Sequence, residues 1–172
     1  MRPCDTLTAM HTNPPTGSSL HLFRHALATL AYRGGKAVRG APASFAEFSA
    51  APGARTPAQI LAHIGDLLDW ALSRVEGQQR WHDSTPLPWD KEVERFFAAL
   101  GKLDSFLSSA SELKATPEKL FQGPIADALT HVGQINILRR LAGCPVRAEN
   151  YFVAEISAGR VGADQAAPKR EF

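Results

Sequence analysis

Residues 56–75 read TPAQILAHIGDLLDWALSRV, and this stretch decides the fold class. Thr56 and Gln59 have the spacing of a capping box, in which two side chains satisfy the free N–H groups at a helix start. Pro57 stands at the first helical position, where its missing N–H costs nothing. Apolar side chains then recur every three or four positions as far as Val75. This periodicity predicts a long amphipathic helix with one broad apolar face.

Three further segments carry the same helical periodicity, at about residues 18–38, 90–109 and 124–143. No window shows sustained strand alternation, so the sequence predicts an all-α fold, an antiparallel four-helix bundle. The last helix is apolar nearly all round, which predicts a central position. Residues 40–56 form a long connection between the first two helices and could cross the bundle.

The chain length of 172 residues fits one domain. Residues 1–17 are interpreted as a flexible N-terminal lead-in, because prolines and polar residues interrupt them. Residues 18–158 hold the helical bundle domain. Residues 159–172 are interpreted as an extended C-terminal tail.

Composition excludes several classes of protein. Nineteen Lys and Arg against 17 Asp and Glu leave a net charge of +2 without a basic run, so we expect no nucleic-acid partner. No apolar stretch resembles a signal peptide or a membrane span, so we expect no membrane association. Two cysteines, Cys4 and Cys144, are too few to brace the domain, which favours a reducing compartment. The expected localisation is cytoplasmic.

Three polar residues on two predicted helices suggest a metal site. Asp127 and His131 are one helical turn apart, about 6 Å along the axis, and can converge on one ion. His63 flanks the apolar face of the helix that begins after residue 56. If the two helices face each other, these residues form a set of two histidines and one carboxylate. Such a set suits Zn²⁺, Ni²⁺ or Fe²⁺.

Each of these residues also has an interpretation without a metal. His63 fits a hydrogen-bonded residue at the edge of the core. Asp127 falls in the first turn of its predicted helix, where a carboxylate favours the positive end of the helix dipole. His131 and Gln134 fit hydrogen bonds to neighbouring helices. Spacing alone leaves both interpretations open.

Other polar candidates are weaker. His21 and His25 are one turn apart but point away from the apolar face of their helix, so we expect an exposed pair. Asp66 lies on the polar side of its helix and is interpreted as a surface group, with the role of orienting a ligand histidine as the alternative. Arg139 is expected to complement the dipole at a helix C-terminus. The three tryptophans fit either core packing or a pocket lining: Trp70, Trp81 and Trp89.

Two of these helical stretches resemble a known family. Residues 56–68 are similar to the second helix of the DinB/YfiT-like superfamily. Residues 127–143 resemble its signature helix, in which a His-x-Gly-Gln-Ile run precedes a leucine-rich end and a glycine. Residues 149–165 are similar to the C-terminal part of a bacterial subgroup. Order and spacing agree over residues 18–165.

The resemblance implies a four-helix bundle, often a homodimer, with a divalent metal held by three histidines. By position, His63 and His131 match two of the ligands. The third falls on Asp127, where many members have histidine, and a carboxylate can serve the same purpose. Zinc or nickel is the metal that the resemblance implies, and iron also fits the donor set.

The resemblance implies one function, and the lack of a second catalytic group beside the proposed ligands leaves an alternative. Some relatives are thiol S-transferases or isomerases that use a low-molecular-weight thiol such as bacillithiol, mycothiol or glutathione. The first hypothesis is therefore a metal-dependent S-transferase or hydrolase acting on small electrophilic molecules, with its catalytic residues unassigned. The alternative is a non-catalytic dimeric bundle with a structural or vestigial metal site, acting as an interaction or stress-related protein.

Overall fold

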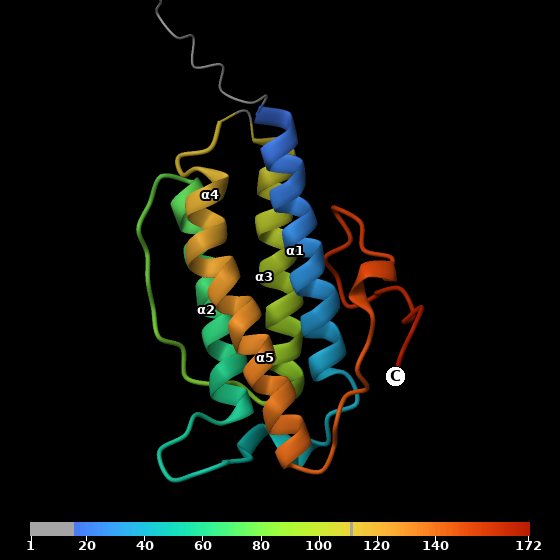
Figure 1. Ribbon diagram of the computed structural model, residues 1–172. Helices are drawn as coiled ribbons and strands as arrows, with labels where there is room; N and C mark the ends of the chain where they lie inside the picture. The colour runs from blue at the N-terminus through green and yellow to red at the C-terminus, as the bar shows by residue number, and fades with distance from the viewer. Residues whose placement is uncertain (1–15, 111) are drawn as a thin grey trace, which may run out of the picture.

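A computed structural model describes residues 16–110 and 112–172 of the protein (Figure 1). The predicted all-α class is confirmed, since long helices pack around one apolar core and the described residues contain no strand beyond an isolated bridge. The lead-in expected over residues 1–17 lies outside the described residues, as does Cys4, except that the first helix begins at Thr16. The long helices are α1 (Thr16–Val38), α2 (Pro57–Val75), α3 (Trp89–Ser109) and α5 (Ala126–Leu141). Short helical segments are η1 (Ala43–Glu47), α4 (Pro117–Leu120), η2 (Phe121–Ile125) and η3 (Tyr151–Val153).

The start of α2 confirms the predicted capping box. The N–H of Gln59 donates to Thr56 Oγ1 at 3.3 Å, and the N–H of Thr56 donates to Gln59 Oε1 at 2.9 Å. Pro57 occupies the first turn, and the helix runs to Val75. Local sequence therefore fixes where α2 begins and which face it buries.

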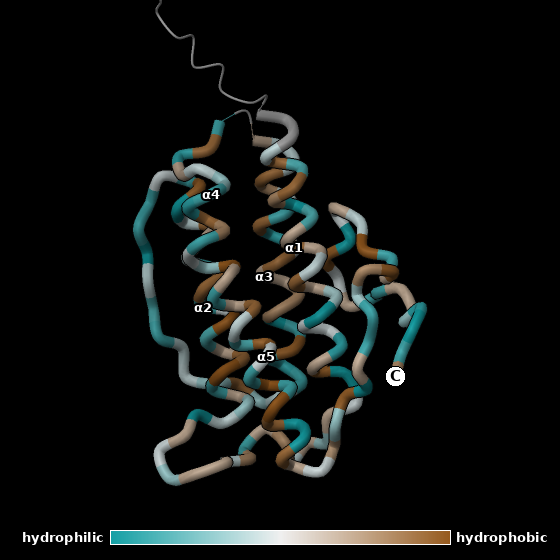
Figure 2. The backbone as a smooth tube through the Cα atoms, viewed as in Figure 1, coloured by the Kyte–Doolittle hydropathy of each residue, from teal (hydrophilic) through white to brown (hydrophobic). Residues whose placement is uncertain are grey.

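Helices α2 and α3 run in the same direction, so the antiparallel arrangement predicted for the bundle is wrong for this pair (Figure 1). The α2–α3 connection, residues 76–88, returns along the whole of α2 before α3 begins. On its way back the connection contacts the middle of α2, where the N–H of Ser84 donates to Asp66. The residues after α3 lie near the end of α2, since the N–H of Lys114 donates to the Val75 carbonyl. The connection is mostly hydrophilic (Figure 2). It is long enough to span the about 28 Å of α2 and therefore need not form a tight hairpin.

The fourth long helix begins earlier than predicted. Thr116 caps α4, and the helix continues through η2, which has π-helical geometry, into α5. The expected start at residues 123–124 is therefore wrong. Pro124 has no N–H to donate, and the wider π turn accommodates it without ending the helix.

Helix α5 is buried on one side only. Its inner face is buried against α1 and α2, but Ile137 and Leu141 are 56% and 60% exposed. The predicted central position is therefore wrong, and α5 packs on the bundle as one of four comparable helices. The number of apolar residues in this helix led to too high a predicted burial, because two of those residues, Ile137 and Leu141, point outward.

Glycines let α1 and α3 approach closely. A Cβ atom at Gly34 would lie 2.5 Å from Phe96 Cζ, and one at Gly35 would lie 3.2 Å from Phe97 Cζ. The aromatic rings fill the space that side chains would take. Glycine has a low helix propensity, yet α1 continues to Val38 because tertiary packing supports it.

Arg139 has a structural role that goes beyond the predicted one. It is only 5% exposed, and its guanidinium donates to the carbonyls of Ala37, Arg39 and Cys144. Ala37 and Arg39 lie at the C-terminal end of α1, and Cys144 follows the end of α5. Arg139 therefore joins the C-terminal ends of two helices, which extends the predicted complement of one helix dipole to a second helix.

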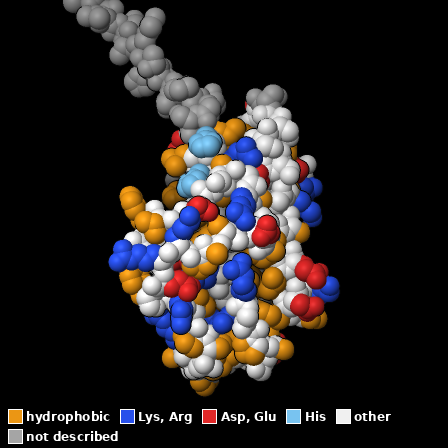
Figure 3. All heavy atoms as spheres, turned by 90° about the vertical axis from the view of Figure 1, so that its right-hand side faces the viewer, with side chains coloured by type: hydrophobic (Ala, Val, Ile, Leu, Met, Phe, Trp, Pro, Cys, Tyr) orange, Lys and Arg blue, Asp and Glu red, His pale blue; other side chains and the backbone are white. Residues whose placement is uncertain are grey.

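The segment after α5 lies along α1. Lys36 donates to Glu149 at 2.6 Å and to Glu171 at 2.7 Å, and Tyr32 donates to Glu149 at 2.6 Å. Val161 is buried in the core. Positive and negative side chains are interspersed on this face, without a continuous area of one sign (Figure 3). Among the described helices, none has both the length and the apolar character needed to cross a membrane.

Candidate metal centre

The candidate site lies where α2 and α5 pack together. His63 comes from α2, and Asp127 and His131 come from successive turns of α5. The Asp127 carboxylate oxygens lie 3.7 Å from His63 Nε2 and 3.4 Å from His131 Nε2. The two imidazole rings meet edge to face, with centroids 4.8 Å apart. The structure thus brings together the three residues selected from the sequence, which we call the His–Asp–His cluster.

The spacing of this cluster fits a small divalent ion. One donor atom from each residue lies within 4.8 Å of the other two. Zinc bonds of 2.0–2.2 Å in tetrahedral geometry place ligand atoms about 3.3 Å apart, close to both Asp127 distances. The Asp127 side chain is 48% exposed, whereas that of His131 is 11% exposed. An ion held here would therefore keep a side open to a further ligand.

Asp127 does not stand at a free helix start. The helix already runs from Pro117, and the N–H of Ala126 is directed to the Phe121 and Gly123 carbonyls. The N–H groups near Asp127 are therefore used within the helix. The dipole interpretation of this carboxylate loses its basis, because it required an unpaired first turn.

Gln134 orients His131. The Nδ1 atom of His131 lies 2.9 Å from Gln134 Oε1, one turn further along α5. An amide oxygen only accepts hydrogen bonds, so the tautomer that satisfies this contact has the proton on Nδ1 and presents the Nε2 lone pair to the cluster. An outer hydrogen bond of this kind fixes the tautomer and ring orientation of a metal-ligating histidine.

The surroundings of His63 favour its neutral form. Burial lowers the pKa of His63 below its ordinary value, and the nearby His131 and Arg55 lower it further, while Asp127 opposes them. A neutral imidazole is the form that binds metal. His63 is therefore prepared for coordination above its lowered pKa.

Aromatic side chains form one wall of the cluster. Trp81 meets His63 edge to face with centroids 5.8 Å apart, and Trp70 meets Trp81 in the same way at 6.0 Å. A Cβ atom at Gly123 would lie 3.8 Å from the Trp70 ring, so the π turn passes close to it. Trp81 thus contacts the cluster through His63 and Trp70 packs behind Trp81, whereas Trp89 packs on Phe45.

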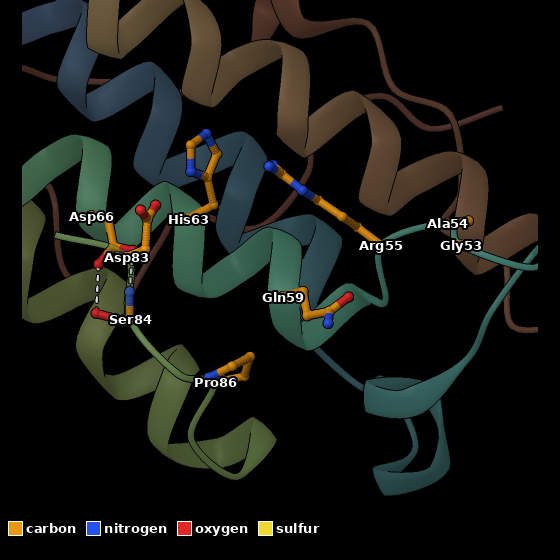
Figure 4. A pocket seen from close by; sticks show the side chains of 9 residues that line it. All are labelled: Gly53, Ala54, Arg55, Gln59, His63, Asp66, Asp83, Ser84 and Pro86. Carbon is orange, nitrogen blue, oxygen red and sulfur yellow. Dashed lines mark hydrogen bonds between the residues drawn. The ribbon is translucent and has the colours of Figure 1, made fainter.

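A cavity of about 440 Å³ opens beside the cluster (Figure 4). His63 is the cluster member that lines it. The remaining walls come from the segment before α2 and from the α2–α3 connection. The lining residues that Figure 4 draws include Arg55, Gln59, Asp66, Asp83 and Ser84.

A second acidic group lies on the opposite side of α2 from the core. Asp66, Asp69 and His82 also bring donor atoms within 4.8 Å of one another. Here a guanidinium takes the place of an ion, because Arg95 donates to Asp66 and, at 3.2 Å, to Asp69. Ser84 donates to Asp66 through its N–H at 2.9 Å and its hydroxyl at 2.7 Å. This group is satisfied by the protein itself.

Asp66 is buried, at 3% exposed, so its interpretation as a surface group is wrong. Burial by itself would raise the pKa of Asp66, but hydrogen bonds from Ser84 and Arg95 outweigh it and hold the pKa below its ordinary value. Sequence reasoning missed Arg95 and Ser84 because a helical wheel does not show what covers the polar side. Gly65 was a usable signal, since a glycine inside a helix often marks a close approach.

Comparison of the chain with models of protein families, with curated proteins and with solved structures finds no match. The geometry of the site is therefore the basis for assigning a function.

Proposed function

We propose that the protein is a divalent-metal-binding bundle of the DinB/YfiT-like kind that acts as a metal-dependent S-transferase or hydrolase on small electrophilic molecules. One observation carries the proposal, namely the convergence of His63, Asp127 and His131 on one point beside a cavity. The resemblance of residues 56–68 and 127–143 to that family supports the same ligand positions. The family assignment and the reaction are part of the proposal.

The donor set supports zinc or nickel first, and iron as a further choice. A bound divalent ion would supply Lewis-acid chemistry, lowering the pKa of a thiol or water held on its open side. His63 and His131 contribute neutral nitrogen donors, and Asp127 contributes a negative charge that offsets part of the positive charge of an ion. Gln134 holds His131 in the required orientation. A cavity of about 440 Å³ falls in the size range of small-molecule sites.

A second candidate function has its own supporting observation. Ile137 and Leu141 leave apolar surface exposed on α5, as an interaction protein requires. The alternative is therefore a non-catalytic dimeric bundle in which the ion, if bound, has a structural role. A fourth protein ligand, or a site closed to small thiols, would favour this alternative.

The proposal is tested by elemental analysis of tag-free protein purified without added metal. We expect about one zinc or nickel per chain. Substituting His63→Ala or Asp127→Ala should remove most of it. His25→Ala should retain it, since His25 lies on α1 outside the cluster; it is half-buried, whereas the sequence predicted an exposed residue. Full metal content in both cluster variants would contradict the assignment. So would a native protein that binds neither Zn²⁺ nor Ni²⁺ after equilibration with each.

A further inference from the structure

A guanidinium group without an ion-pair partner stands at the cavity beside the His–Asp–His cluster. Arg55 and His63 line the same cavity, and the Arg55 side chain extends from the segment before α2 toward the His63 ring (Figure 4). Among the described residues that line the cavity, Arg55 carries the only guanidinium. Arg95, which contacts the lining residue Asp66, is held by Asp66 and Asp69. Among the described residues, no carboxylate lies within 4.0 Å of the Arg55 guanidinium.

The backbone at Arg55 is held in place. Arg55 immediately precedes Thr56, and the capping box between Thr56 and Gln59 anchors Thr56 to the first turn of α2. The exposed side chain therefore projects from a fixed base. A guanidinium presents several N–H donors in a planar fork, which matches a carboxylate or a phosphate.

The negative charges around the cavity limit what can bind. Asp66 lines it, but Arg95 and Ser84 satisfy that carboxylate. Asp83 also lines it, is exposed, and forms no ion pair among the residues described. Asp83 would repel a second negative charge on the ligand, so a ligand with one negative charge opposite Arg55 fits the cavity better. Carboxylates carry one charge at neutral pH, whereas phosphate monoesters carry nearly two.

We propose that this cavity binds a small molecule with a single carboxylate, which Arg55 holds while another donor atom of the same molecule reaches the His–Asp–His cluster. This inference rests on the proposed function, because it assigns the substrate class of the same site. Arg55 is then a specificity-determining residue and not a metal ligand.

The test uses the full chain loaded with cobalt(II), in which a bound thiolate gives a charge-transfer absorption band. The probes are mercaptocarboxylates from 3-mercaptopropionate to 6-mercaptohexanoate, each paired with the mercaptoalcohol of equal length. The best carboxylate should bind about tenfold more tightly than its alcohol, as one charged hydrogen-bond contact at a partly exposed site provides. Arg55→Gln should remove this preference, and Arg55→Lys should keep part of it. Lys102→Gln removes an exposed charge from α3 and should change nothing.

Each other outcome has a defined meaning. Equal affinities for acid and alcohol in the native protein, or a preference that persists in Arg55→Gln, would overturn the inference and leave the metal site standing. Tighter binding of 2-mercaptoethyl phosphate than of any mercaptocarboxylate would overturn the carboxylate assignment in favour of phosphate. Cobalt content is measured first on every variant. A native chain that takes up no cobalt would overturn the proposed function, and the inference with it.

Discussion

Replacing Gly65 by alanine should destabilise the protein, although alanine is the better helix former. A Cβ atom at Gly65 would lie 2.9 Å from Arg95 Cζ and 3.1 Å from its Nε. These separations are shorter than non-bonded contacts allow, so the guanidinium must move. It would move away from Asp66, whose side chain is 3% exposed and depends on it for charge compensation.

The expected magnitude follows from two opposing effects. Alanine in a helix interior is favoured over glycine by about 1 kcal/mol. Against this, weakened charged hydrogen bonds from Arg95 to Asp66 and Asp69 cost about 2–3 kcal/mol, allowing for the part of Arg95 that is exposed. Ser84 continues to donate to Asp66, which limits the loss. Gly65→Ala should therefore lower the free energy of unfolding by about 1–2 kcal/mol.

Urea unfolding followed by circular dichroism measures this change. Gly101→Ala on α3 is the matched control, because a Cβ atom there meets nothing within 4 Å. It should raise the free energy of unfolding by about 0.5–1 kcal/mol. In an Arg95→Ala background the obstacle is gone, and Gly65→Ala should then be stabilising as well. A stabilising effect in the native background, or an equal penalty in the Arg95→Ala background, would refute the reasoning.

Three further predictions follow from the same structure. Gln134→Leu should weaken zinc binding about 10–100-fold, since His131 loses the partner that sets its tautomer. Competition with a chromophoric chelator measures the affinity, and an unchanged affinity would contradict the orienting role of Gln134. The pKa of His63 is lowered in the folded protein, so the unfolded chain binds the proton more readily. Metal-free protein should therefore lose stability as pH falls below about 6.5 through that lowered pKa, and His63→Gln should reduce this loss; an identical pH profile for the variant would contradict the assignment. Gly34→Ala should cost about 1–3 kcal/mol by displacing Phe96, as overpacking of a core does; thermal unfolding tests it, and a Phe96→Leu background that leaves the cost unchanged would point to another cause.

Much of the secondary structure could be predicted, because its signals are local. The capping box at Thr56 and the apolar period as far as Val75 define α2 within the sequence of that helix alone. Asp127 and His131 share a face because helical spacing requires it. The start of the fourth helix was missed because Gly123 and Pro124 usually punctuate helices, and here a π turn carries the helix through them.

What could not be predicted depends on contacts between distant parts of the chain. A helical wheel of α2 shows Asp66 on the polar side but does not show the connection that covers it. The parallel course of α3 could not be predicted either, because it is accompanied by contacts of Arg95 and Ser84 with Asp66, and none of these residues signals the others in sequence. That His63 faces Asp127 likewise required α2 and α5 to be neighbours, which the sequence analysis could state only as a condition.

The direction of α3 and the form of the candidate site are linked. Because α3 runs parallel to α2, the connection must return along α2, and this course places Trp81 against His63 and Ser84 on Asp66. A tight hairpin would have left the outer side of His63 open to water. The cluster thus takes its donor atoms from α2 and α5, while the connection provides a wall of its cavity. Loosening the connection at Ser84 should consequently alter what the cavity binds before it alters whether the cluster holds an ion.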